Sequence, residues 1–187
     1  MNERVKNRLD YINSKAYHKY RVSVPYDVTD ILKAASPMME TTKLFTLACD
    51  REVPLLFGDD IFGFNRYHTE LPHDEHVDKI PGAIRFSGNM IIDYATFLEG
   101  GINGYLSKID KYYEINKDSS ELYDCMKLCL KSCENIVNKY KELAKKENNI
   151  KLYSALQNVP MNGATNYYEA LICIRFLSFI IRLARIQ

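Results

Sequence analysis

The stretch that decides the fold is GNMIIDYATFLEGGINGYLSKIDKYY, residues 88–113. Its apolar side chains recur every three or four positions, which is the 3.6-residue period of an amphipathic helix. The residues in this stripe are Ile91, Tyr94, Leu98, Ile102, Tyr105, Ile109 and Tyr112. The pattern predicts a short loop that leads into a long helix with one buried face.

Three glycines, Gly100, Gly101 and Gly104, lie inside that helical pattern. A glycine in a helix interior costs roughly 1 kcal/mol relative to alanine. We therefore expect another helix or a stretch of backbone to pack so closely against this turn that side chains would not fit.

Amphipathic patterns in the rest of the chain predict further helices, at residues 2–15, 37–50, 121–146, 150–157 and 166–185. Pro37 suits a first helical turn, because its missing amide hydrogen would have no partner there. Asp118 and Glu121 form a possible capping box for the long helix that follows them. Thr165 is the expected N-cap of the last helix.

The stretch VPLLFGDDIFGFNR, residues 53–66, has a different composition. Two short apolar runs flank Gly58, Asp59 and Asp60, a pattern typical of a β-hairpin. Residues 67–85 contain two prolines and no periodicity, which indicates an irregular excursion. The expected fold is mainly α: a multi-helix single domain, residues 1–187, with one small β-hairpin.

The composition limits which classes of partner the protein is expected to bind and in which compartment it is expected to lie. The 187 residues are 47% hydrophobic, enough to bury a core, and 25 basic against 24 acidic residues give a net charge of +1. We therefore expect no nucleic-acid partner. The apolar last helix is interrupted by Arg175 and is too short to span a bilayer, so we expect no membrane partner. Five cysteines and a charged N-terminal sequence favour a reduced, cytoplasmic protein.

Two groups of residues could bind a metal ion. Cys125, Cys129 and Cys133 follow one another at four-residue steps, so they share a helix face that overlaps its apolar stripe. They could hold a cluster, or they could pack as small hydrophobes. His73 and His76 could share a metal or face solvent. We expect packing and solvent exposure, and hence no metal and no cofactor.

Several stretches resemble a known family when they are taken in order. They are NERVKNRLDYI, PLLFGDDIFGFNR, the 88–113 stretch, LYDCMKLCLKSCENIVNKYKELA and ALQNVPMNGATNYYEAL. In this order they are similar to the N-terminal part of pyruvate formate-lyase-like glycyl radical enzymes, which are radical lyases, dehydratases and acyltransferases. The resemblance implies a helical N-terminal region.

Members of that family are several times longer than this chain. They carry a catalytic cysteine loop inside a barrel and a C-terminal glycine-radical loop, and this sequence contains neither. The resemblance therefore implies a truncated or split member without catalytic residues, inactive alone. It would bind a small-molecule substrate only with a chain that supplies the missing barrel.

The resemblance also points to a site. Its matching loop approaches the substrate, which makes Phe86, Ser87 and Asn89 the candidate substrate-binding residues. Many members have a histidine or arginine near Asn89, but asparagine can only donate and accept hydrogen bonds and cannot hold a carboxylate by charge. Alternatively, Asn89 only caps the following helix. Asp93 and Tyr94 are expected to be structural.

A second function is compatible with the same sequence. The last helix is apolar on nearly every side, which is more surface than one face of a small helical domain covers. Exposed apolar patches drive association. The alternative is thus a non-enzymatic interaction module that binds a partner or forms a homo-oligomer through residues 170–187.

Overall fold

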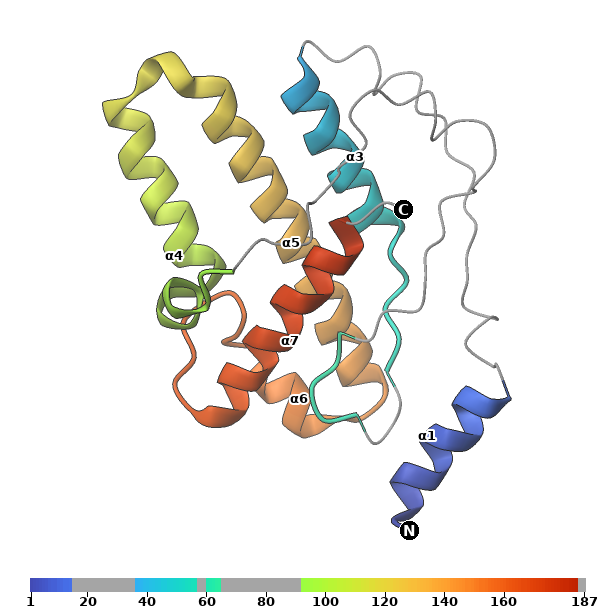
Figure 1. The fold of residues 1–187 in the computed structure, drawn as a ribbon. Coiled ribbons are helices and arrows are strands. Elements are labelled where there is room, and N and C mark those ends of the chain that lie inside the picture. The colour runs from blue at the N-terminus through green and yellow to red at the C-terminus, as the bar shows by residue number, and fades with distance from the viewer. Residues whose placement is uncertain (15–35, 57–59, 65–91, 185–187) are drawn as a thin grey trace, which may run out of the picture.

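The computed structural model describes residues 1–14, 36–56, 60–64 and 92–184, and the described part is mainly helical, as predicted (Figure 1). The helices are α1 (Glu3–Asn13), α3 (Pro37–Arg51), α4 (Tyr94–Ile115), the short 3₁₀ helix η3 (Lys117–Ser119), α5 (Ser120–Lys146), α6 (Ile150–Ala155) and α7 (Tyr167–Ala184). Their bounds agree with the amphipathic patterns to within a few residues.

The core forms around α5, which packs against α3, α4 and α6, while α7 contacts α3 and α4. At its centre lies the ring of Phe64, which is almost fully buried. Its centroid is 4.6 Å from the ring of Tyr140, 5.1 Å from Phe176 and 5.9 Å from Phe179. One loop residue therefore joins side chains from α5 and α7.

The predicted β-hairpin is not supported. No strand forms in residues 52–56 or 60–64, whereas Gly58 and Asp59 of the predicted turn lie outside the described residues. Gly63 (φ 64°) and Phe64 (φ 51°) are both left-handed, and a strand needs a strongly negative φ. These two residues instead turn the chain so that Phe64 enters the core.

Lys139 of α5 fixes the end of α3. Its Nζ donates to the main-chain oxygens of Cys49 at 3.0 Å, Asp50 at 2.7 Å and Glu52 at 3.0 Å. A cation is favourable at a helix C-terminus because the last carbonyl groups have no partner within the helix. This contact holds α3 against α5.

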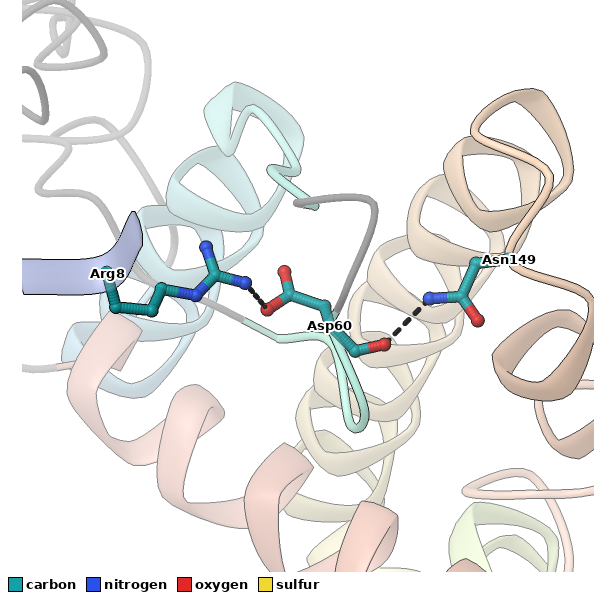
Figure 2. Close-up of polar contacts among 3 residues, drawn as sticks. All are labelled: Arg8, Asp60 and Asn149. Carbon is teal, nitrogen blue, oxygen red and sulfur yellow. Dashed lines mark hydrogen bonds and ion pairs between the residues drawn. The ribbon is translucent and has the colours of Figure 1, made fainter. Parts of the chain in front are cut away.

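The amphipathic helix predicted at residues 2–15 is α1, and a polar chain of contacts joins it to the body (Figure 2). Arg8 Nη2 donates to Asp60 Oδ1 at 2.6 Å. The main-chain oxygen of Asp60 accepts from Asn149 Nδ2 at 2.7 Å. Asn149 Oδ1 in turn accepts from the amide of Leu152 and caps α6.

The predicted start of α3 is confirmed, but the capping box predicted for the long helix α5 is wrong. Pro37 occupies the first turn of α3 as expected, with Ser36 as N-cap. Asp118, however, lies in η3, and α5 begins after Ser119 without a side-chain cap. The Glu121 carboxylate accepts from Ser36 Oγ instead, so it links two helices and closes no capping box.

The last helix is partly covered. Its inner side chains belong to the core: Ile172, Cys173, Phe176, Phe179 and Leu183. Ile174 remains exposed, and Leu171 and Ile181 are half-buried. Within the described part of the chain, none of the helices, α7 included, combines the length and the hydropathy that crossing a bilayer requires.

Candidate functional site

The predicted substrate-binding residues, Phe86, Ser87 and Asn89, lie outside the described residues, as do His73, His76 and the 67–85 excursion. The described chain resumes at Ile92, three positions after Asn89. The structure describes the start of α4, which follows the loop with Phe86, Ser87 and Asn89 in the sequence. We call the start of α4 the base of this loop.

Asp93 is the N-cap of α4. Its Oδ1 accepts from the amide of Thr96 at 3.1 Å, and hydrogen bonds from Thr96 lower the pKa of the Asp93 carboxyl. The alternative in which Asn89 caps this helix is therefore wrong. Asp93 is structural, as expected, although it lies one residue before the first turn.

Helix α4 is broken at Gly101. This residue has φ 60° and ψ −156°, a conformation that glycine adopts readily and other residues do not. The break separates residues 94–100, which we call the N-terminal segment of α4, from residues 102–115. The two segments run in different directions (Figure 1). Two new helix ends arise, and their backbone groups need partners from elsewhere.

Residues 158–164, here called the splint loop, supply those partners. The amides of Ile102 and Asn103 donate to the main-chain oxygens of Pro160 at 3.0 Å and Met161 at 2.9 Å. On the other side of the break, Leu98 O accepts from the amide of Ala164 at 2.8 Å. The splint loop thus caps the end of one segment and the start of the next.

Two glycines make this approach possible. A Cβ on Gly101 would lie 2.6 Å from the main-chain oxygens of Pro160 and Asn162, and one on Gly163 would lie 2.1 Å from that of Glu99. At Gly100 and Gly104 a Cβ would meet nothing within 4 Å. The expectation of a close backbone neighbour is therefore confirmed for Gly101 and wrong for the other two helical glycines.

Glu169, in the first turn of α7, accepts hydrogen bonds from residues at the start of the splint loop and directly after its end. Its Oε2 accepts from Asn158 Nδ2 at 2.9 Å, from the Thr165 amide at 2.8 Å and from Thr165 Oγ1 at 2.9 Å. Asn166 Oδ1 accepts from the Glu169 amide at 3.0 Å, so Asn166 and not Thr165 caps α7. Asn158 Nδ2 also donates to Gly163 O at 3.2 Å, so the side chain that binds Glu169 from the start of the splint loop also contacts the loop near its end.

The charge of Glu169 is stabilised in the fold. Burial alone would raise the pKa of this carboxyl, but hydrogen bonds from Thr165, Asn158 and Asn166 outweigh burial, and the pKa is lowered. A lowered folded pKa means that the stabilisation is fully present above the unfolded pKa of about 4.3. It is lost as the pH falls through the folded value.

We expect this loss to be measurable with Glu169→Gln, which keeps the size of the side chain and removes its charge. The stability advantage of the wild type over the variant should be constant near neutral pH and should shrink as the pH falls below about 4.3. Urea denaturation followed by circular dichroism from pH 7 to pH 3 checks this. An advantage that does not change over that range would contradict the assignment.

All five cysteines lie in described helices, and Cys129 alone of them is not buried. Burial raises the pKa of Cys133 and of Cys173 to about 12 and raises that of Cys49 further. Cys49, Cys133 and Cys173 belong to the core, in agreement with a packing role. Among the described residues, no three histidine, cysteine or acidic side chains are placed to hold a metal ion.

The buried thiols should be nearly inert in the native protein. A thiolate is the reactive form, so a pKa near 12 together with burial should slow alkylation of Cys133 and Cys173 at pH 8 by at least about a hundredfold relative to the protein in urea. Mass spectrometry of peptides after timed iodoacetamide treatment measures each site. Equal rates in the native and the unfolded protein would show that these helices open freely.

Sequence reasoning missed the splint loop and Glu169. The signals were present, since Gly163 and three asparagines, Asn158, Asn162 and Asn166, lie between two helical patterns. They indicate a loop rich in hydrogen-bonding groups with one close approach, but they do not show where that approach occurs.

Comparison with known proteins places the chain in a family. The pyruvate formate lyase-like family model matches residues 67–185, more than half of the 187 residues. The matched range contains α4, the splint loop and α7, which are the elements that build the base described above. No curated protein and no solved structure matches the chain. On the family match, the chain belongs to the pyruvate formate lyase-like family.

Proposed function

We propose that this chain supplies the helical N-terminal scaffold of a glycyl radical enzyme, and that residues 1–187 are catalytically inactive alone. The observation that carries the proposal is the placement of its cysteines within a chain of this family. They lie on α3, α5 and α7, and four of the five are buried.

The chemistry implied by the family explains why this placement matters. A glycyl radical generates a thiyl radical on a cysteine, and the thiyl radical abstracts hydrogen from the substrate. Such a cysteine must meet the substrate, whereas Cys133 and Cys173 contact the core of their own domain. The reacting thiol and the radical glycine would therefore come from the part of the enzyme that forms the barrel.

The part of a substrate site that this chain would contribute is the loop with Phe86, Ser87 and Asn89. Asn89 would orient a hydroxyl or amide group of a small molecule by hydrogen bonds, and Phe86 would form an apolar wall. The start of α4 is capped by Asp93 and hydrogen-bonded to the splint loop. This supports the role, because a loop that binds a substrate needs a fixed base.

Electron paramagnetic resonance tests the proposal. The purified chain is incubated anaerobically with a radical-generating activase, and the spectrum is recorded. We expect no glycyl radical signal and no lyase or dehydratase turnover from this chain. A stable glycyl radical doublet on the chain by itself would overturn the proposal.

A second candidate function is self-association through α7, for which the outward side chains Leu171, Ile174 and Ile181 provide the support. The occupant of this face would be a second copy of the chain. Phe176 is buried and cannot serve as a probe, so Ile174→Asp is the appropriate variant. Sedimentation should show a dimer for the wild type and a monomer for the variant. A monomeric wild type at tens of micromolar would remove this candidate.

A further inference from the structure

The sequence contains two Asn-Gly pairs, Asn103-Gly104 in α4 and Asn162-Gly163 in the splint loop. An asparagine before glycine is prone to deamidation, because glycine has no Cβ to hinder attack of its amide nitrogen on the asparagine side chain. We propose that Asn162 is a modification site at which the native protein deamidates spontaneously, and that Asn103 promotes the reaction. The reaction needs neither a substrate nor a radical, so it is independent of the proposed function.

Deamidation at this pair joins the main chain to the side chain of the preceding residue. The amide nitrogen of Gly163 loses its proton to solvent base and attacks Cγ of Asn162. The Cγ–Nδ2 bond breaks, and Nδ2 leaves as ammonia after taking a proton from water. One water molecule then opens the succinimide ring, at Cγ to give aspartate or at the main-chain carbonyl to give isoaspartate. Isoaspartate lengthens the main chain by one bond between Met161 and Ala164, which are both hydrogen-bonded to α4.

The attacking amide has no competing hydrogen bond. Within the described part of the chain, the amide of Gly163 donates to no acceptor. The amides on either side of it are engaged, since Asn162 donates to Asn158 O at 2.9 Å and Ala164 donates to Leu98 O at 2.8 Å. Asn162 itself is exposed and lies in a bend outside the helices. Solvent base can therefore take the Gly163 proton without breaking a contact of the fold.

The carbonyl group that is attacked is polarised by Asn103. Asn103 Nδ2 donates to Asn162 Oδ1 at 2.9 Å. Negative charge develops on Oδ1 as the nitrogen adds to Cγ, and a donor already in place stabilises that charge. The leaving Nδ2 of Asn162 donates to Asn158 Oδ1 at 3.3 Å, which is long for a hydrogen bond of this type. The contacts of this side chain thus favour addition at Cγ and departure of Nδ2.

The other Asn-Gly pair provides a comparison within the same molecule. Asn103 lies in the helical segment 102–115 of α4. Ring closure requires the Cβ of an asparagine and the next amide nitrogen to be nearly eclipsed about the Cα–C bond, and helical dihedral angles keep them apart. Asn103 should therefore keep its amide while Asn162 reacts, although both precede glycine and their side chains are hydrogen-bonded to each other.

Peptide mapping by mass spectrometry tests the proposal. The full chain is incubated in mildly alkaline buffer made with ¹⁸O-labelled water, once folded and once in urea, and samples are digested at intervals. The label separates product formed during the incubation from product that was present before it, and each digest reports on both pairs. Asn103→Leu removes the donor at an exposed position, and Glu114→Leu, exposed on the same helix, is the matched control.

We expect Asn162 of the folded protein to deamidate at least about tenfold faster than Asn103, and the two to react at similar rates in urea. Asn103→Leu should slow the reaction at Asn162 severalfold, and Glu114→Leu should not change it. A folded protein in which Asn162 reacts no faster than Asn103 would overturn the assignment of the site. An Asn103→Leu variant that reacts at the wild-type rate or faster would overturn the role of Asn103, because a side chain that only tethers the loop would slow the reaction.

Discussion

Gly163→Ala is expected to destabilise the protein by about 4 kcal/mol, which is at the upper end of what single substitutions do. The added Cβ would lie 2.1 Å from the main-chain oxygen of Glu99 and 2.7 Å from its carbonyl carbon. Backbone cannot rotate away as a side chain can, so the splint loop must move. That movement breaks the hydrogen bond between Ala164 and Leu98. Urea denaturation followed by circular dichroism measures the loss.

The matched control is Gly104→Ala. This glycine lies in α4, the helix that contains Glu99, and a Cβ there meets nothing within 4 Å. Alanine should stabilise the helix by about 0.5–1 kcal/mol, because it has less conformational freedom to lose on folding. Equal stability of the two variants would mean that the splint loop does not lie against α4.

Phe64→Ala should cost about 3–5 kcal/mol, the range for removing a fully buried aromatic ring. The ring contacts Tyr140 of α5 and both Phe176 and Phe179 of α7, so its loss leaves a cavity between two helices. Ile61→Ala, three residues earlier at an exposed position, is the control and should cost far less. Thermal and urea unfolding of the three proteins provides the comparison.

The backbone of Phe64 allows a sharper version of this experiment. Its φ of 51° is unfavourable for any residue with a Cβ, by roughly 1–2 kcal/mol. Phe64→Gly should therefore be more stable than Phe64→Ala by about 1 kcal/mol, although glycine is usually the worse choice. A glycine variant that is less stable than the alanine variant would show that this turn is not left-handed.

The helices could be predicted from the sequence because their signals are local. The apolar stripe of α5 and the proline at the start of α3 are set by neighbours within one or two turns, and both elements were found near their predicted bounds. The hairpin failed for the opposite reason. The apolar run around Phe64 has the composition of a strand, but its ring is drawn into a core built from α5 and α7.

The candidate site was harder to predict for the same reason as the hairpin, because its contacts join residues that are far apart in the sequence. Gly100, Gly101 and Gly104 have the same residue type and neighbouring positions, yet only Gly101 faces the splint loop. Which of them breaks the helix depends on a segment about sixty residues later in the chain. Glu169 likewise has the sequence context of a first-turn acid, and its hold on Asn158 follows only from the tertiary fold.

The most direct test of the splinted break in α4 is the measurement of scalar couplings across hydrogen bonds in protein labelled with ¹⁵N and ¹³C. The structure predicts a coupling between the nitrogen of Ile102 and the carbonyl carbon of Pro160, and another between the nitrogen of Ala164 and the carbonyl carbon of Leu98. In an unbroken helix, the amide of Ile102 would instead donate to Leu98, four residues earlier. A coupling from Ile102 to Leu98, with none to Pro160, would contradict the account.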